Sequence, residues 1–395
     1  MIVLQVIFWF SLLLIIHTYL LFPAILHILA RKKDPRQQPE GPESYPFVSI
    51  LIAAYNEEEV ISKKIKSVLQ GTYPVDRLEI LVGSDASTDG TNQELSTLAA
   101  GNPVIQTVFF KTRTGKPGVI NHLAGRARGE VLIITDANVM LDERTIPEVV
   151  SRFSDPRCGL VDTMMINTRH QKDGISQQER FYISREVRIK HQESLIWGSM
   201  MGPFGGCYAV RKELFRPVPD NFLVDDFYIN MAVLQQGFHC ISNLEAKVYE
   251  DVSNDLWEEF RRKKRISAGN FQNLAVFRGM LFSRLPGVPF CFFSHKVIRW
   301  LVPFLVMITL GSSLFLAKFW MFYKILALLH GVVLAIPLLD LLLRIFKIHA
   351  LPLRFISHFV IMNLALLAGF IRYLGGIKSN VWQPTRRNQV HAEHD

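Results

Sequence analysis

The chain has 395 residues, of which 49% are hydrophobic and 20% are charged, and its net charge is +9. This hydrophobicity excludes a disordered chain, which combines low hydrophobicity with high net charge. The four cysteines form no CxxC pair, which excludes a small disulfide scaffold and disfavours a structural zinc site. The basic residues form no face interleaved with aromatic side chains, so we expect no nucleic-acid partner.

The first 30 residues contain no Lys, Arg, Asp or Glu, and Arg31, Lys32 and Lys33 follow them directly. An apolar helix of this length exceeds the roughly 30 Å hydrocarbon core of a bilayer. The segment has neither the basic start nor the small-residue cleavage site of a signal peptide. We therefore expect a transmembrane helix over residues 1–30 and a linker over 31–45. Basic residues just after the helix place the next domain in the cytoplasm by the positive-inside rule.

Three more apolar segments lie near the C-terminus, at 300–317, 325–339 and 355–371. We expect two to three membrane helices within residues 295–376, entered through an interfacial segment at 279–294. Three crossings would put the basic tail, 377–395, on the outer face, whereas its charges favour the cytoplasm. The sequence leaves this count open, and 355–371 is the weakest span. A bacterial plasma (inner) membrane is the simplest location.

Short apolar runs alternate with helical patterns between the two membrane regions, over residues 46–278. The expected strands cover 47–54, 78–83, 104–110 and 131–135, and the clearest expected helices cover 58–70 and 119–128. Buried strands separated by helices predict an α/β domain whose mostly parallel sheet has helices on both faces. In such a sheet, ligands bind beyond the carboxyl ends of the strands.

Acidic and amide side chains follow three of these strands, as YNE at 55–57, SDASTDG at 84–90 and DAN at 136–138. Each cluster alone has a structural explanation as a turn or a helix cap. Because the carboxyl ends of parallel strands meet at one edge, the three clusters together predict an oxygen-rich site. Such a site suits Mg²⁺ or Mn²⁺ with a diphosphate.

The ordered set AYNE, SDASTDGT, GKPGVIN and TDAN resembles the nucleotide-sugar half of family 2 glycosyltransferases with the GT-A fold. Further along, GGCYAVRKELF, VDD at 224–226 and RKKRI at 262–266 resemble the acceptor half of membrane-bound members. These include cellulose, chitin and hyaluronan synthases and ceramide glucosyltransferases. The likeness implies a Rossmann-like, mostly parallel GT-A domain in the cytoplasm, between one N-terminal and two to three C-terminal transmembrane helices.

The same resemblance implies a nucleotide-sugar site formed by Tyr55, Glu57, Asp85, Lys116, Asn121 and Asp136. Tyr55 and Glu57 would line the base pocket, and Asp85 would bind the uridine. Asp136 and Asn138 stand at the DxD position, which contacts the ribose and the metal, Mg²⁺ or Mn²⁺. An Asn offers a carbonyl oxygen but no charge, so we expect weaker metal affinity than two acids would give.

Asp226 matches the family's catalytic base, which takes the proton of the attacking acceptor hydroxyl, and Asp225 lies beside it. Alternatively, one of these carboxylates caps the helix that follows. Arg262 and Arg265 fit the (Q/R)xxRW motif, whose arginine steadies the departing pyrophosphate. Alternatively, these two arginines belong to a run of solvent-exposed basic residues without a catalytic role. Ile266 replaces the Trp of the motif, which puts processive polymerisation in doubt.

The sequence therefore predicts an inverting, metal-dependent glycosyltransferase. It would move a sugar from a UDP-sugar to a lipid-linked or growing polysaccharide acceptor, with membrane lipids around it; UDP rests on the resemblance alone. One alternative is a non-processive, glycolipid-forming transferase. Another is a non-catalytic subunit of a polysaccharide synthase complex, since the DxD and RxxRW motifs are both altered. A nucleotidyltransferase of similar topology would not explain the paired acids at 225–226.

Overall fold

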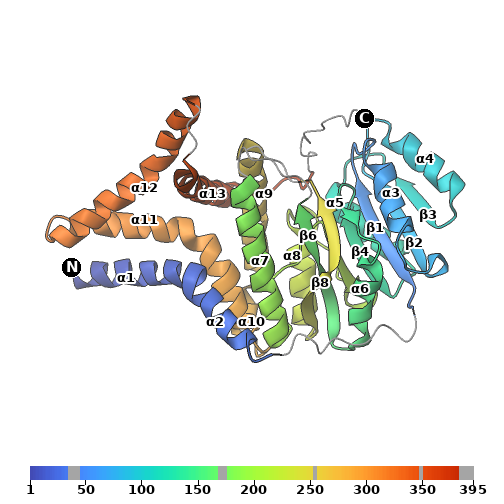
Figure 1. Cartoon of the computed structure of the whole chain (residues 1–395), viewed down its shortest axis with the longest axis horizontal. Coiled ribbons are helices and arrows are strands. Elements are labelled where there is room, and N and C mark those ends of the chain that lie inside the picture. Colours follow the sequence, from blue (N-terminus) through green and yellow to red (C-terminus); the bar gives the residue numbers. More distant parts are fainter. Residues whose placement is uncertain (34–44, 168–175, 252–255, 347–349, 382–395) are drawn as a thin grey trace.

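A computed structural model describes residues 1–33, 45–167, 176–251, 256–346 and 350–381 (Figure 1). The strands are β1 (Val48–Ala54), β2 (Leu78–Ser84), β3 (Ile105–Phe109), β4 (Val131–Asp136), β5 (Met140–Leu141), β6 (Cys158–Asn167), β7 (Cys207–Arg211) and β8 (His239–Glu250). The helices of this domain are α3 (Ile61–Leu69), α4 (Thr91–Gly101), α5 (Gly115–Arg126), α6 (Thr145–Ser151), α7 (Ser176–Trp197), α8 (Asp225–Gln235) and α9 (Leu256–Phe277). Its short helical turns are η2 (Val75–Arg77), η3 (Arg152–Ser154), η4 (Lys212–Leu214) and η5 (Arg278–Phe282).

The eight strands form one sheet in the order β3-β2-β1-β4-β7-β6-β8-β5. The four strands predicted from the sequence, β1 to β4, are parallel to one another. The sheet as a whole is mixed, because β7 runs antiparallel to both β4 and β6, and β5 runs antiparallel to β8. Strands β6 and β8 run parallel to each other. This half of the sheet, β5 to β8, had no clear signal in the sequence, since its strands are short or only partly apolar.

Helices cover both faces of the sheet, which is why β1 and β2 are buried along their whole length. One apolar core lies under α3, α4 and α6 and contains Ile50, Ile65 and Val149. The other lies under α5 and α8 and contains Leu51, Leu123 and Val233. Alternate residues of each strand thus enter opposite cores, as the period of a strand requires. The prediction of a sheet with helices on both faces is confirmed.

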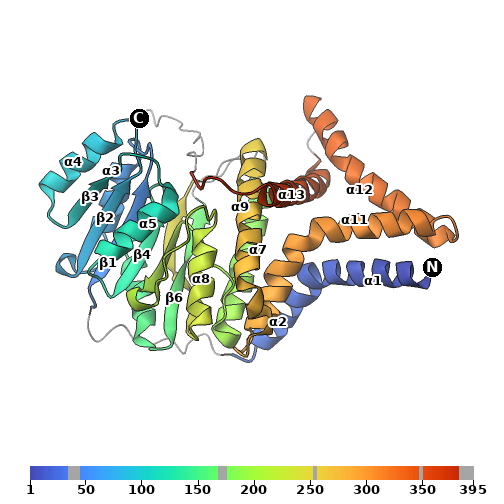
Figure 2. The same cartoon turned by 180° about the vertical axis from the view of Figure 1, so that it is seen from behind.

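Among the residues that the structure describes, four helical segments are long and apolar enough to cross a membrane, at Ile2–Ala30, Val288–Leu316, Met321–Leu343 and Leu351–Leu374. They consist of α1 (Ile2–Ile16), η1 (His17–Leu21), α2 (Phe22–Ala30), α10 (Val288–Cys291), η6 (Phe292–Val297), α11 (Ile298–Leu316), α12 (Met321–Ile345) and α13 (Leu351–Leu374). Helices α1 and α11 lie side by side and point away from the sheet (Figures 1 and 2). The Phe8 side chain is fully buried between them, against Leu316 and Tyr323.

Helix α13 runs across α1 and α11 instead of alongside them, and it packs on α9 of the α/β domain (Figure 2). The Ser267 hydroxyl donates to the Leu366 carbonyl at 2.7 Å, and the rings of Phe271 and Phe370 lie 4.8 Å apart. Beyond α13, the chain returns to the α/β domain. There the Asn380 side chain occupies the space that a Cβ at Gly115 would need.

Candidate functional site

The carboxyl ends of β1, β2 and β4 meet at one edge of the sheet, as predicted. The parallel register sets Ala54 opposite Ser84 and Ala53 opposite Asp136. The three polar clusters that follow these strands therefore lie together. Asn56 joins two of them, because its side chain accepts a hydrogen bond from the Thr88 amide at 2.8 Å.

Asp85 is fully buried, and it holds the start of α5. Its carboxylate accepts hydrogen bonds from the backbone amides of Thr114 at 2.6 Å and Gly115 at 3.1 Å, where the positive end of a helix dipole favours an anion. Arg113 donates to the same carboxylate at 2.9 Å, and its guanidinium stacks 3.2 Å from the centre of the Tyr55 ring. Arg113, which the sequence did not single out, thus joins two of the predicted donor-site residues.

Lys116 lies on the first turn of α5 and connects both halves of the site. Its ammonium is 2.7 Å from Asp136 Oδ1 and 3.9 Å from Asp225 Oδ2, and it donates to the Gly205 carbonyl at 3.0 Å. Burial lowers the pKa of Lys116, but Asp136 and then Asp225 outweigh burial and hold that pKa above its usual value. Lys116 therefore stays charged and balances the carboxylates around it.

Asp225 and Asp226 occupy the first turn of α8. Asp226 Oδ1 accepts a hydrogen bond from the Phe227 amide at 2.7 Å, so this residue also stabilises the helix start, as the alternative reading expected. Burial raises the pKa of Asp226 to about 6, Asp225 adds to this rise, and Lys116 opposes it. Among the described residues, the buried Oδ2 of Asp225 has no hydrogen-bond partner.

The loop between α7 and β7 was not predicted as the centre of the site, yet it contacts three of its charged residues. The Gly205 carbonyl accepts a hydrogen bond from Lys116, as described above. The Gly206 carbonyl accepts a hydrogen bond from the Asp136 backbone amide at 2.9 Å. A Cβ at Gly205 would collide with the Asp226 carboxylate, so a residue without a side chain is required there. The motif FGG at 204–206 was the available signal, but core packing explained it equally well.

Asn138 has an acidic neighbour that the sequence did not indicate. Strand β5 pairs antiparallel with β8, with Met140 opposite Tyr249, and this register brings the end of β8 beside the Asp-Ala-Asn turn. There Asn138 donates its amide to Glu250 Oε1 at 3.1 Å. Glu250 thus brings a carboxylate close to the position where the sequence has an amide in place of an acid.

The other predicted site residues differ in the partners that they contact. Arg265 donates to the Leu223 carbonyl at 3.3 Å; burial lowers its pKa, and the nearby carboxylates, Asp225 foremost, oppose that shift. Arg262 instead pairs with Glu259 on its own helix, at 2.7 and 3.1 Å. Asn121 exchanges two hydrogen bonds with the Val218 backbone. Glu57 is buried beside Thr91, whose hydroxyl accepts from the Glu57 amide at 2.8 Å.

The oxygen atoms at this edge suit a hard divalent cation only if a bound substrate supplies further oxygen ligands. The Asp136 carboxylate and the Asn138 carbonyl are oxygen ligands of the kind Mg²⁺ and Mn²⁺ prefer. In the part of the chain that the structure describes, no group of three or more His, Cys, Asp or Glu side chains could hold a metal on its own. A diphosphate would supply the missing oxygens, and the residues present fit that arrangement.

Comparison with known proteins agrees with this geometry. The model of the family "Glycosyl transferase family 2" matches residues 49–218, which contain the strand-end clusters and the 204–206 motif. Residues 49–218 form a family 2 glycosyltransferase domain. The resemblance seen in the sequence is therefore confirmed. The three strand-end clusters, Lys116 and the 204–206 motif lie within this domain, whereas Asp225, Asp226, Glu250 and Arg265 follow it in the chain.

The relatives of the transferase domain are themselves glycosyltransferases. A β-monoglucosyldiacylglycerol synthase from Nostoc sp. is 27% identical over 173 residues, which cover 43% of this chain and 36% of that protein. The probable glycosyltransferase YdaM from Bacillus subtilis is 23% identical over 286 residues, covering 68% of this chain and 66% of that one. The matched region thus spans about a third of the Nostoc synthase and two thirds of YdaM.

A solved structure confirms the fold over nearly the whole chain. It is a mannosyltransferase from Pyrobaculum calidifontis in complex with GDP-Man and Mn²⁺, with a TM-score of 0.70 and 20% identity, covering 93% of this chain and 99% of that one. At this identity the likeness establishes the fold alone. The predicted GT-A architecture is confirmed, together with one N-terminal and three C-terminal helices able to span a membrane.

Proposed function

We propose that the protein transfers a sugar from a nucleoside diphosphate sugar to an acceptor hydroxyl at a membrane, with inversion at the anomeric carbon. Asp226 is the base that takes the acceptor proton. The observation that carries this proposal is the placement of Asp226. It lies at the strand-end site beside Gly205, with a pKa near 6, so that it is ionised at neutral pH yet still basic.

Other charged and polar residues of the site also take part in this reaction. Lys116 and Arg265 are fixed cations near the carboxylates, and they stabilise the diphosphate as negative charge builds on it. Asp136 and Asn138 would hold a divalent cation, Mg²⁺ or Mn²⁺, which neutralises further charge on the leaving group when bound. Tyr55 and Asp85, joined through Arg113, form the wall that we assign to the nucleotide base.

The donor is proposed to be a UDP-sugar, on the sequence resemblance, and the acceptor a lipid or lipid-linked glycan. Ile266 in place of the motif's Trp and the likeness to a glycolipid synthase favour a single transfer over processive polymerisation. Because the Pyrobaculum relative was solved with GDP-Man, the test must offer both nucleotides. Detergent-purified protein is supplied with UDP- and GDP-sugars and Mn²⁺ or Mg²⁺, and nucleoside diphosphate release is measured. Metal-dependent release from one donor supports the proposal, whereas nucleotide binding without release from any donor favours the non-catalytic subunit.

The metal site yields a prediction about Glu250. Its hydrogen bond to Asn138 Nδ2 leaves the carbonyl oxygen of Asn138 for a cation, and its charge compensates for the missing acid. We expect Glu250→Gln to weaken Mn²⁺ binding in the presence of UDP or GDP by about 10-fold, as loss of a residue supporting a metal ligand does. Electron paramagnetic resonance titration of free Mn²⁺ measures this without turnover.

The matched control exchanges the two groups. Asn138→Asp combined with Glu250→Gln again places one carboxylate and one amide side by side, so Mn²⁺ affinity should return to within about 3-fold of the wild type. Equal affinity in the wild type and in Glu250→Gln would remove Glu250 from the metal site.

The path of the chain also predicts its membrane topology. Asn380 touches Gly115 of the transferase domain, so the chain must return to the side it left. An odd number of crossings after the domain would forbid this return. We therefore propose that α11 and α12 cross the membrane, and that α13, packed on α9, lies in the interface on the cytoplasmic side.

Cysteine labelling in sealed vesicles tests this topology. The four native cysteines are buried, so an impermeant maleimide should report on introduced ones. We expect Ser379→Cys to label in the same vesicle orientation as Asp76→Cys, on the exposed surface of the domain, and Lys318→Cys to label only in the opposite orientation. Labelling of Ser379→Cys together with Lys318→Cys would show that α13 crosses the membrane.

A further inference from the structure

The segment between α7 and β7, residues 198–206, is here called the 198–206 loop. It brings backbone groups to the residues that we assign to catalysis. The Gly205 carbonyl receives Lys116, and the Gly206 carbonyl receives the Asp136 amide and the Thr135 hydroxyl at 3.0 Å. Asp226 lies against Gly205. A shift of this loop would therefore disturb the positions of Lys116 and Asp136 and the contact of Gly205 with the base, Asp226.

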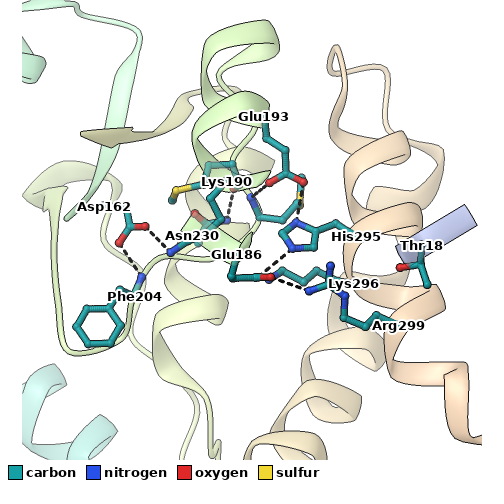
Figure 3. Close-up of polar contacts among 12 residues, drawn as sticks. Thr18, Asp162, Glu186, Lys190, Glu193, Phe204, Asn230, His295, Lys296 and Arg299 are labelled. Carbon is teal, nitrogen blue, oxygen red and sulfur yellow. Dashed lines mark hydrogen bonds and ion pairs between the residues drawn. The ribbon is translucent and has the colours of Figure 1, made fainter. Parts of the chain in front are cut away.

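A buried ion pair, Asp162–Lys190, holds the last residues of this loop in place. The Phe204 amide donates to Asp162 Oδ1 at 2.6 Å, and Lys190 Nζ lies 2.6 Å from Asp162 Oδ2 (Figure 3). Asp162 lies on β6 and Lys190 on α7, and their exposed fractions are 0% and 5%. Neither residue belongs to the donor or acceptor site described above.

The first part of the loop is held in the same way. Glu193, also on α7, accepts the Met201 amide at 3.0 Å, and its other oxygen lies 2.7 Å from His295 Nδ1 on η6. Asn230 of α8 donates to the Met200 carbonyl at 3.1 Å. Figure 3 shows these side chains between the sheet and the C-terminal helices. The loop is thus fixed by buried polar groups along its length.

Stability alone does not account for the Asp162–Lys190 pair. Taking both charges out of water costs several kcal/mol per ion by general estimates, and well-packed apolar residues often do as well or better. What such residues cannot supply is an acceptor for the Phe204 amide at a fixed place. A misplacement of about 1 Å in a site of this kind lowers the rate by roughly 10²-fold.

We propose that Asp162 and Lys190 are positioning residues of the transferase: Lys190 orients Asp162, and Asp162 fixes the Phe204 backbone, so that Gly205 sits between Lys116 and Asp226. This inference rests on the proposed function, because it concerns the same site. The pair therefore affects kcat, whereas binding of the sugar donor depends on Tyr55 and its neighbours.

Two double variants separate positioning from stability. Asp162→Asn/Lys190→Met removes both charges but keeps a carbonyl oxygen for the Phe204 amide. Asp162→Leu/Lys190→Met removes the charges and the acceptor. The comparison requires that the two variants have similar Tm values. We then expect the Asn variant to keep kcat within about 3-fold of the wild type. The Leu variant should lose about 10- to 100-fold in kcat while its donor KM changes by less than about 3-fold.

Equal kcat values in the two variants would overturn the inference. If the Leu variant does not melt cooperatively, Lys190 alone offers a comparison that keeps Asp162, since its ammonium lies 2.6 Å from Asp162 Oδ2. Lys190→Met should then lose kcat and Lys190→Arg should keep it; equal values would again contradict us.

Amide hydrogen exchange at Phe204 needs no turnover and separates this inference from the proposed function. We expect exchange to accelerate in Asp162→Leu/Lys190→Met and to stay slow in Asp162→Asn/Lys190→Met. Unchanged protection in both overturns the positioning role, even where the wild type is active. Absence of turnover in the wild type on every donor contradicts the proposed function instead.

Discussion

Replacing Asp226 with Asn should lower kcat by about 10²- to 10⁴-fold, the contribution expected of a general base. The amide keeps the shape of the side chain and an acceptor for the Phe227 amide, so α8 should start as before. Donor affinity, measured by calorimetry with the nucleoside diphosphate, should stay within about 3-fold of the wild type. Loss of nucleotide binding in parallel with activity would instead assign Asp226 a structural role.

The pH dependence of kcat/KM, which reports on groups of the free enzyme, provides a second test of the same residue. Asp226 acts in its ionised form, and its pKa lies at about 6. The value of kcat/KM should therefore be half-maximal near pH 6, reach a plateau about one pH unit above it and fall about tenfold per pH unit well below it. Asp225→Asn is the matched control on the same turn. Asp225 raises the pKa of Asp226, so its removal should move this acidic limb to lower pH.

Replacing Lys116 with Met should have the second largest effect. The variant removes one of the two cations that Asp136, Asp225 and Asp226 share, so these carboxylates would repel a donor diphosphate more strongly. We expect kcat/KM to fall by roughly 10²-fold, comparable to the loss of a fixed group that stabilises transition-state charge. Steady-state kinetics on the preferred donor measures the change.

The sign of the accompanying pH shift distinguishes this cause from simple loss of a contact. Lys116 lowers the pKa of Asp226, so in Lys116→Met that pKa rises and the acidic limb moves to higher pH. Lys116→Arg keeps the charge and should leave the limb near pH 6, although the planar guanidinium does not reproduce the geometry of an ammonium. An unshifted limb in Lys116→Met would contradict the electrostatic link between the two residues.

The parallel half of the domain was predictable because each element carries its own signal. Strand β4 begins as a continuous apolar run, and β1 and β2 are mostly apolar. The rule that ligands bind at the carboxyl ends of strands turns three local clusters into one site. Helix α5 starts at Gly115, four residues earlier than the predicted 119, because Pro117 fits the first turn of a helix. This early start is what puts Lys116 beside Asp136.

The half of the sheet formed by β5 to β8 was not predictable in the same way. Glu250 meets Asn138, and Asp162 meets Phe204, only because strands far apart in sequence pair in a particular register. Neither contact follows from periodicity or spacing. Arg113 was missed for a related reason, since it stands in a polar loop where nothing distinguishes a residue stacked on Tyr55 from a solvated one.

The configuration of the released sugar tests the central claim most directly, because it needs no knowledge of the acceptor. Purified protein is incubated in D₂O with its preferred α-linked donor and no acceptor, and proton NMR follows the anomeric signal of the hydrolysed sugar before mutarotation. Direct displacement with Asp226 as the base predicts that the β-anomer forms first and that Asp226→Asn stops its formation. First formation of the α-anomer, or an unchanged rate in the variant, would contradict a single displacement by an acceptor that Asp226 deprotonates.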